Sequence, residues 1–378
     1  MIIYVVEKGD SLYDIAKKYN MDYRQIASDN EIPINRDLVV GQTLVIIPNK
    51  SIKKFVKIEV NGYAFPSIDR NTLKKALPHL TYLSIFSYSV NSDGSLNAIN
   101  DDELISLAKE YKVTPNMVIT NIGDGERFDS DLAHYILNNE DIQNKLISNV
   151  IDIMKKKDYK GLDVDFEYVY PEDKEAYSNF LTKVKNEIKK YNYIFSVAVA
   201  PKTRDDQPGI LYEAHDYKKI GELADHIIIM TYEWGYSGGP SMAVAPLNLV
   251  ENVISYAVTR IPPSKILMGI PNYGYDWTLP YIEGSLAGSI SNYEAVTLAK
   301  DNNQSINYDI KSQSPYFKYF NQNGIEHEVW FEDARSILAK LNLVLKYNLG
   351  GISYWTIDRI FPQNYLVLSS LLNIKKNS

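Results

Sequence analysis

The sequence predicts an α/β protein in which a small βααβ unit precedes a (β/α)8 barrel of the TIM type. Three observations lead to this prediction. Strand-like and helix-like patterns alternate from residue 55 onward in the 378-residue chain, which is typical of a parallel sheet with crossover helices. One strand, residues 161–168, alternates strictly between small or acidic and apolar or aromatic residues. The first 48 residues follow a separate pattern of their own.

The N-terminal unit reads as strand, helix, helix and strand. A strand at residues 3–6 is followed by a turn at residues 9–11, where Asp10 or Ser11 can cap a helix. A second short helix is expected around residues 22–30, and residues 41–48 close the unit as a strand. A polar and basic stretch, residues 49–54, is expected to be the linker to a domain spanning residues 55–378.

This first segment resembles the LysM module along its whole length. The matching stretches are residues 4–6, 8–12, 15–19 and 40–48, together with Asn30. LysM modules bind the N-acetylglucosamine of chitin or peptidoglycan, so the resemblance implies a glycan site between two loops. The residues that it implies are Gly9, Asp10, Ser11, Leu12, Ile32, Pro33, Ile34 and Asn35. The alternative is a purely structural cap.

Eight strands are expected in the second domain. They are residues 56–63, 82–89, 117–121, 162–168, 194–200, 226–232, 266–271 and 351–356. The clearest helix begins near Pro171, because the apolar residues between Tyr177 and Ile188 recur at helical spacing. Such barrels carry their chemistry at the carboxyl ends of the strands.

One interval interrupts the alternation of strands and helices. Residues 277–330 separate the seventh strand from the next helix, and a plain loop of that length is uncommon in a compact domain. We therefore expect a small α+β insertion there, with two or three strands and a helix that wall one side of the site.

Composition argues against several classes of function. The net charge of −7 argues against a nucleic-acid partner. The absence of cysteine excludes disulfides and thiolate metal sites, and five histidines argue against a metal cluster. The N-terminus lacks the features of a secretory signal, and no apolar run reaches the length of a membrane span. The 30 tyrosines would suit stacking against sugars.

The acidic strand is the strongest candidate for chemistry. On a strand, Asp163, Asp165 and Glu167 share one face, each about 6.6 Å from the next, while the apolar residues between them face the other side. Close carboxyl groups titrate as a coupled set, so at least one should hold a proton near neutral pH. A solvated edge strand with charges on its wet face is the alternative.

Residues 161–167 resemble the signature of glycoside hydrolase family 18, Asp-Gly-x-Asp-x-Asp-x-Glu. The glycine matches at Gly161, and the three acids match at Asp163, Asp165 and Glu167. The first Asp of the motif is Lys160 here, and we expect this departure to tune the site from outside. The resemblance extends over about residues 55–375.

Two further stretches add to this resemblance. Residues 230–233, Met-Thr-Tyr-Glu, are similar to the family's Met-x-Tyr-Asp, although Glu233 replaces the Asp. Trp355, at the end of the eighth expected strand, matches the aromatic floor of the family's cleavage site.

The resemblance implies a substrate-assisted mechanism in which the sugar's own acetamido oxygen is the nucleophile. Glu167 would act as general acid and then as base, and Asp165 would orient the acetamido group. Asp163 would share a proton or hydrogen bond with Asp165. Tyr232 would donate its hydroxyl to the acetamido carbonyl, and Trp355 would pack against the sugar. No metal and no cofactor are expected.

Other residues are expected to contact substrate on weaker grounds. Glu233 fits a substrate contact or a scaffold hydrogen bond equally well. Tyr63, Asn121, Asn272 and Tyr273 lie at other strand ends and fit either a cleft lining or ordinary packing. Tyr232 and Trp355 also fit plain core packing.

Taken together, these features resemble the spore-cortex lytic N-acetylglucosaminidases of spore-forming bacteria. The predicted function is hydrolysis of β-1,4 bonds next to N-acetylglucosamine in peptidoglycan. A chitinase and a non-catalytic lectin on the same barrel are the alternatives. The expected partner is a peptidoglycan or chitin-type glycan, with no nucleic acid and no membrane, bound by a monomer. Because no signal peptide is evident, we expect synthesis in the cytoplasm and deposition on the spore coat or cortex.

Overall fold

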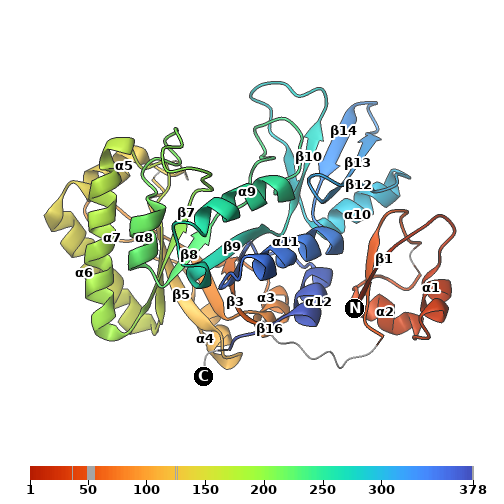
Figure 1. Cartoon of the computed structure of the whole chain (residues 1–378), viewed down its shortest axis with the longest axis horizontal. Coiled ribbons are helices and arrows are strands. Elements are labelled where there is room, and N and C mark those ends of the chain that lie inside the picture. Colours follow the sequence, from red (N-terminus) through yellow and green to blue (C-terminus); the bar gives the residue numbers. More distant parts are fainter. Residues whose placement is uncertain (36, 49–55, 124, 126, 377–378) are drawn as a thin grey trace.

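The structure, a computed structural model, describes residues 1–35, 37–48, 56–123, 125 and 127–376. The linker expected at residues 49–54 lies outside the described residues. A small N-terminal unit sits beside a larger barrel, and a second sheet rises from the upper side of the barrel in Figure 1.

The N-terminal unit contains β1 (Ile2–Val5), α1 (Leu12–Lys18), α2 (Tyr23–Asp29) and β2 (Thr43–Ile46), with β1 and β2 paired antiparallel. Side chains cap both helices, because Ser11 accepts from the Asp14 N–H and Asp22 accepts from the Arg24 N–H. The buried Asn30 amide joins the end of α2 to β2 through both the N–H and the C=O of Val45. Apolar side chains from both helices and from β2 form a small core within the unit.

The predicted barrel is confirmed. Its parallel strands are β3 (Lys57–Ala64), β4 (Tyr82–Ser89), β5 (Thr114–Thr120), β6 (Gly161–Asp165), β7 (Ile194–Val199), β8 (His226–Ile229), β9 (Ile266–Pro271) and β15 (Gly351–Trp355). Each pairs with the next in chain order, and β15 pairs with β3 to close the sheet. The short β16 (Asn373–Ile374) adds to β3. Since β6 ends at Asp165 and β8 at Ile229, Glu167 and Tyr232 lie just beyond their strands.

Helices surround this sheet. They are α3 (Arg70–Ala76), α4 (Asp102–Glu110), α5 (Ser130–Leu137), α6 (Glu140–Lys157), α7 (Lys174–Ile188), α8 (Tyr217–Leu223), α9 (Leu247–Ala257), α11 (Ala334–Lys346) and α12 (Pro362–Leu371). Short 3-10 turns lie at η1 (Leu77–His79), η2 (Pro171–Asp173), η3 (Lys189–Tyr191) and η4 (Pro263–Lys265). Pro171 thus starts η2, one turn ahead of α7. Among the described residues, no helix is both long and apolar enough to cross a membrane.

A separate antiparallel sheet lies between β9 and α11 in the sequence. It has the order β11-β10-β14-β13-β12. Its elements are β10 (Gly274–Thr278), β11 (Gly288–Ile290), α10 (Asn292–Asp301), β12 (Asn307–Asp309), β13 (Ser314–Phe320) and β14 (Glu326–Trp330). This sheet has its own apolar cluster, to which Val39 of the N-terminal unit contributes.

Polar contacts dock the N-terminal unit against the rest of the chain. The N–H of Ile306 donates to the Val40 carbonyl at 2.8 Å, and Arg335 donates to the Gly41 carbonyl at 3.2 Å. Gly41 has a φ of +85°, and a Cβ there would lie 1.9 Å from the Ile306 oxygen. The close approach therefore requires glycine at this position.

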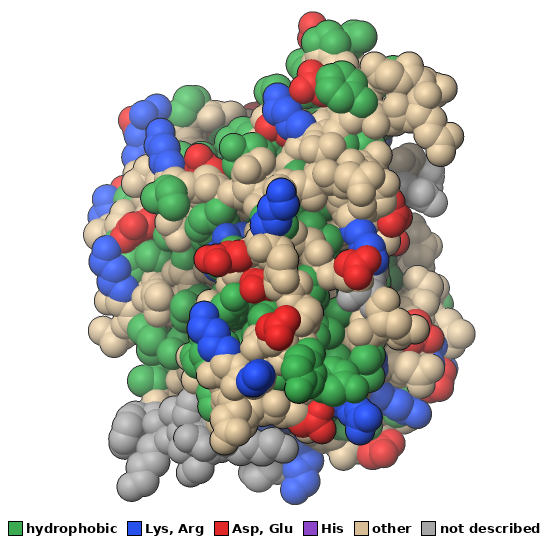
Figure 2. Space-filling view, turned by 90° about the vertical axis from the view of Figure 1, so that its right-hand side faces the viewer, with side chains coloured by type: hydrophobic (Ala, Val, Ile, Leu, Met, Phe, Trp, Pro, Cys, Tyr) green, Lys and Arg blue, Asp and Glu red, His purple; other side chains and the backbone are tan. Residues whose placement is uncertain are grey.

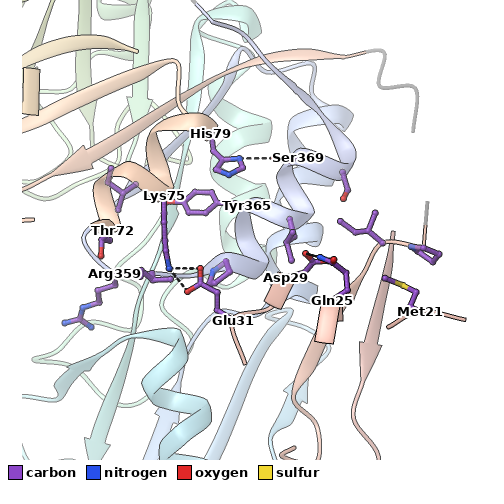
Figure 3. A pocket seen from close by; sticks show the side chains of 17 residues that line it. Met21, Gln25, Asp29, Glu31, Thr72, Lys75, His79, Arg359, Tyr365 and Ser369 are labelled. Carbon is purple, nitrogen blue, oxygen red and sulfur yellow. Dashed lines mark hydrogen bonds and ion pairs between the residues drawn. The ribbon is translucent and has the colours of Figure 1, made fainter. Parts of the chain in front are cut away.

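A groove of about 670 Å³ runs between the N-terminal unit and helices α3 and α12. Figure 3 shows the Lys75–Glu31 ion pair at 2.8 Å, which crosses the groove, and the His79–Ser369 hydrogen bond on its barrel side. Figure 2 views the molecule from the right-hand side of Figure 1, and acidic and basic side chains are interspersed on the face that it shows. This face therefore lacks the single-sign basic patch that a nucleic acid would favour.

Candidate active site

A groove of about 480 Å³ opens among the segments that follow the barrel strands. Carboxyl groups lie at its base, and aromatic rings form much of its wall. The lining residues include Tyr63, Phe86, Phe128, Asp165, Glu167, Tyr168, Tyr212, Tyr232, Glu233, Trp234, Tyr236 and Trp355.

Asp163 lies deepest of the three acids. Its side chain is fully buried on β6, and its two carboxyl oxygens accept hydrogen bonds from the Tyr63 hydroxyl at 2.5 Å and the Ser196 hydroxyl at 2.6 Å. Burial raises the pKa of Asp163, while these two donors oppose the rise. The donors to Asp163 are therefore Tyr63 and Ser196, and the expected hydrogen bond to Asp165 is not found among the contacts of the described residues.

Asp165 lines the groove with little solvent contact. Burial raises its pKa well above the usual range, and repulsion from Glu167 and then Asp163 adds to the rise. Its Oδ1 atom is buried without a hydrogen-bond partner among the described residues. A buried and unpaired polar oxygen is costly, which makes Oδ1 available to a ligand N–H.

Glu167 lies two residues beyond β6 and is half-buried. Burial raises its pKa to about 7, and the negative charge of Glu233 adds to the rise. Its main chain is held by Asn121, whose Oδ1 accepts from the Glu167 N–H at 2.9 Å and whose Nδ2 donates to the Glu167 carbonyl at 2.9 Å. Glu167 therefore combines a fixed backbone with a carboxyl group that titrates near neutral pH.

Glu233 faces the same groove from the segment after β8. Its backbone has a φ of +65°, and its carboxylate accepts hydrogen bonds from the hydroxyls of Tyr273 and Tyr275. Burial raises the pKa of Glu233, while the two tyrosine donors oppose the rise. Tyr232, its neighbour, lines the groove and is nearly buried.

Trp355 is fixed by other aromatic rings. Its ring lies edge-on to those of Phe86, Tyr63 and Phe65, with centroids 4.9, 5.4 and 6.0 Å away. It keeps partial exposure in the groove. This packing fixes a flat apolar surface of the kind that stacks on a sugar ring.

Three of the expected substrate contacts lie behind the groove wall. Asn121 is fully buried, and its amide is engaged by the main chain of Glu167 and Asp129. Asn272 is buried and donates to the carbonyls at 356 and 359. The Tyr273 hydroxyl donates to the carboxylate of Glu233, and Glu233 is the residue that lines the groove. All three sit at strand ends, and each donates to a neighbouring group of the protein, although the Asn272 Oδ1 atom is buried without a partner among the described residues.

Several residues of the site were not predicted. Ser196 contacts Asp163 from β7, and Phe86 packs against Trp355 from β4. Tyr212 and Tyr236 belong to loops without a recognisable motif. None of the four was singled out from the sequence, although Phe86 and Ser196 fall within two of the expected strands, residues 82–89 and 194–200.

The expected glycan residues of the N-terminal unit fall into two groups. Gly9, Pro33, Ile34 and Asn35 are exposed. Leu12 belongs to the unit's core, and the Asp10 carboxylate folds its own loop by accepting from the Glu7 N–H at 2.7 Å and the Tyr4 hydroxyl at 2.8 Å. Ser11 is the cap of α1, and Ile32 is half-buried. Four of the eight expected glycan residues are therefore open to solvent.

The profile of "Glycosyl hydrolases family 18" matches residues 60–359. This chain belongs to glycosyl hydrolase family 18. The match includes all three acids of β6 and its following segment, as well as Tyr232 and Trp355. The LysM profile matches residues 4–46, so the N-terminal unit is a LysM domain.

Relatives within this family share the full length of the chain. The "Cortical fragment-lytic enzyme" of Bacillus subtilis (strain 168) is 40% identical over 430 residues, covering 100% of both chains. The crystal structure of the Bacillus cereus spore cortex-lytic enzyme SleL matches with a TM-score of 0.94 at 37% identity, covering 99% of each chain. A chitinase from Chromobacterium violaceum shares the fold, with a TM-score of 0.76 at 24% identity over 83% of this chain and 98% of that one.

Proposed function

We propose that this protein hydrolyses β-1,4 bonds next to N-acetylglucosamine in spore-cortex peptidoglycan. The observation that carries the proposal is the arrangement of Glu167, titrating near neutral pH, beside Asp165 with its unpartnered buried oxygen. The LysM domain and the full-length likeness to cortical fragment-lytic enzymes support peptidoglycan as the polymer. The intact acids favour an enzyme over a lectin on the same barrel.

In the first step, Glu167 transfers its proton to the glycosidic oxygen as the bond from that oxygen to C1 breaks. The acetamido carbonyl oxygen of the same sugar attacks C1, which gives an oxazolinium ion. Asp165 accepts a hydrogen bond from the acetamido N–H and stabilises the positive charge. In the second step, the Glu167 carboxylate takes a proton from water, whose oxygen attacks C1 and reopens the ring with net retention.

The surrounding residues support these steps. Asp163, held by Tyr63 and Ser196, keeps a hydrogen-bonded carboxyl group beneath Asp165. Tyr232 donates its hydroxyl to the acetamido carbonyl, and Trp355 packs against the apolar face of the sugar. Glu233 raises the pKa of Glu167 from across the groove.

The proposal assigns parts of the chain to separate tasks. Residues 1–48 bind the glycan strand, residues 49–54 link the two domains, and residues 55–378 form the catalytic domain. The insertion at residues 277–330 was expected to wall one side of the groove, but none of its residues is among those that line it. We also propose that the protein acts as a monomer after deposition on the developing spore.

The variant Glu167→Gln tests this assignment. It should lower the release of reducing ends from purified cortex fragments by ~10²–10⁴-fold, the usual contribution of a general acid, while binding to cortex persists. Undiminished release would overturn the role of Glu167, and release by neither form would favour the lectin. Mass spectrometry of the products identifies the sugar at the new reducing end, and N-acetylmuramic acid there would contradict the proposed specificity.

A further inference from the structure

Glu167 and the residue before it lie outside the main-chain pairing of the barrel. The β6–β7 ladder ends at Val164, paired with Val197, and the β5–β6 ladder ends at Asp165, paired with Thr120. The catalytic acid therefore depends on side chains for the placement of its backbone. No described side chain donates a hydrogen bond to its carboxyl group, so the backbone sets where that group lies.

Asn121 holds one side of this segment. Its single amide binds both the N–H and the carbonyl of Glu167, each at 2.9 Å, and also the Asp129 carbonyl at 3.1 Å. Two of these bonds fix the same residue, so Glu167 cannot rotate about its backbone without breaking one of them. Asn121 is fully buried, and loss of this amide would leave buried main-chain groups unpaired.

His215 holds the other side. Its Nδ1 accepts from the Ala200 N–H at 2.9 Å, so the ring proton must lie on Nε2, which donates to the Phe166 carbonyl at 3.0 Å. The ring is 1% exposed and joins the segment after β6 to the end of β7. Burial lowers its pKa to about 4, so the imidazole is neutral at the pH of catalysis.

His215 is itself held by a buried network. The Lys202 ammonium donates to the His215 carbonyl at 3.1 Å, and the Tyr217 hydroxyl donates to the Ala200 carbonyl at 2.6 Å. Tyr217 also accepts from the Lys202 N–H at 2.9 Å. The His215 main chain and its partner Ala200 are therefore both fixed on the β7 side of the barrel, and the proposed chemistry uses none of these groups.

We infer that Asn121 and His215 are positioning residues that hold the main chain of Glu167 so that its carboxyl stays in the apolar, acid-lined part of the groove. This inference rests on the proposed role of Glu167. The charged groups that face Glu167 in the groove are Asp165 and Glu233. A looser backbone would let the carboxyl reach water, which favours its ionised form.

The test compares His215→Gln with His215→Asn in the full chain. Glutamine carries an acceptor and a donor that can serve Ala200 and Phe166, whereas the shorter asparagine reaches only one of them. We expect His215→Asn to lower kcat about tenfold with KM within about twofold, and to move the alkaline limb of the kcat/KM profile about one pH unit lower. His215→Gln should restore most of both.

The control is Val150→Ala, which removes buried methyl groups from α6 and lowers stability at a place away from the groove. It should leave the pH profile unchanged. Equal profiles for His215→Asn and Val150→Ala, or a glutamine variant no better than asparagine, would overturn the inference. Activity at each pH is divided by the folded fraction measured at that pH, so a poorly folding variant still reports its own limb. For a variant with no folded fraction, Tyr217→Phe should show the same shift to a smaller extent.

These experiments distinguish a failure of the positioning role from a failure of the proposed function. An inactive Glu167→Gln together with an unaltered His215→Asn profile rejects only the positioning role. An active Glu167→Gln rejects the general acid, whatever the histidine variants do.

Discussion

The acidic groove should make the folded barrel less stable as pH rises, and Glu167→Gln should remove part of that loss. Glu167 has a pKa of about 7 in the folded chain, against an ordinary value of 4.5. The difference corresponds to about 3 kcal/mol. Because the folded state binds this proton more tightly than the unfolded state, the stabilising contribution is fully present below pH 4.5. It is lost as pH rises through 7.

We therefore expect Glu167→Gln and the natural chain to have similar stability near pH 4.5. At pH 8 the variant should be more stable, by up to about 3 kcal/mol. Urea unfolding followed by tryptophan fluorescence measures this difference, since all four tryptophans lie beyond residue 230, two at barrel strand ends and two on the second sheet, and none in the LysM domain. Glu222→Gln, an exposed carboxyl on α8, is the matched control and should change stability by less than about 0.5 kcal/mol. A Glu167→Gln stability curve parallel to that of the natural chain between pH 5 and 8 would refute this reasoning.

Three further predictions concern the groove and the docking of the LysM domain. Glu233→Gln removes a charge that raises the pKa of Glu167, so the alkaline limb of the kcat/KM profile should move to lower pH; a limb shifted upward would contradict this. Tyr63→Phe removes a donor to Asp163 and should lower kcat on cortex fragments about tenfold with little change in KM; a purely KM effect would point instead to substrate binding. Gly41→Ala places a Cβ against a backbone oxygen at 1.9 Å and should undock the LysM domain, seen as a larger radius of gyration in small-angle X-ray scattering; an unchanged radius would show that the junction adapts.

The sequence was sufficient for the barrel and for the acids, because both depend on local patterns. Strict alternation places Asp163 and Asp165 on one face of a strand, and the structure has them on β6. Glu167 was expected within that strand. Glu167 lies beyond β6 because the pairing of β6 with β5 and β7 ends before it. The length of this pairing depends on the neighbouring strands, which the local pattern does not specify.

Long-range contacts explain what could not be predicted. Asn121 was expected to line the cleft. Only its hydrogen bond to the main chain of Glu167, 46 residues away in sequence, identifies it as a residue that holds that backbone in place. His215 lies 49 residues from Phe166 in sequence and has no periodic context. A polar residue at a strand end can turn to a ligand or to a neighbouring backbone, and the sequence does not distinguish the two.

The central claim is that Glu167 delivers a proton while the sugar's own amide attacks. The most direct test is the hydrolysis rate on substrates whose acetamido group carries zero, one, two or three fluorines, since each fluorine weakens the carbonyl oxygen as a nucleophile. Our account predicts that kcat/KM falls steeply and in order along this series. A rate that does not change with fluorination would show that another group attacks the sugar, and would contradict the account.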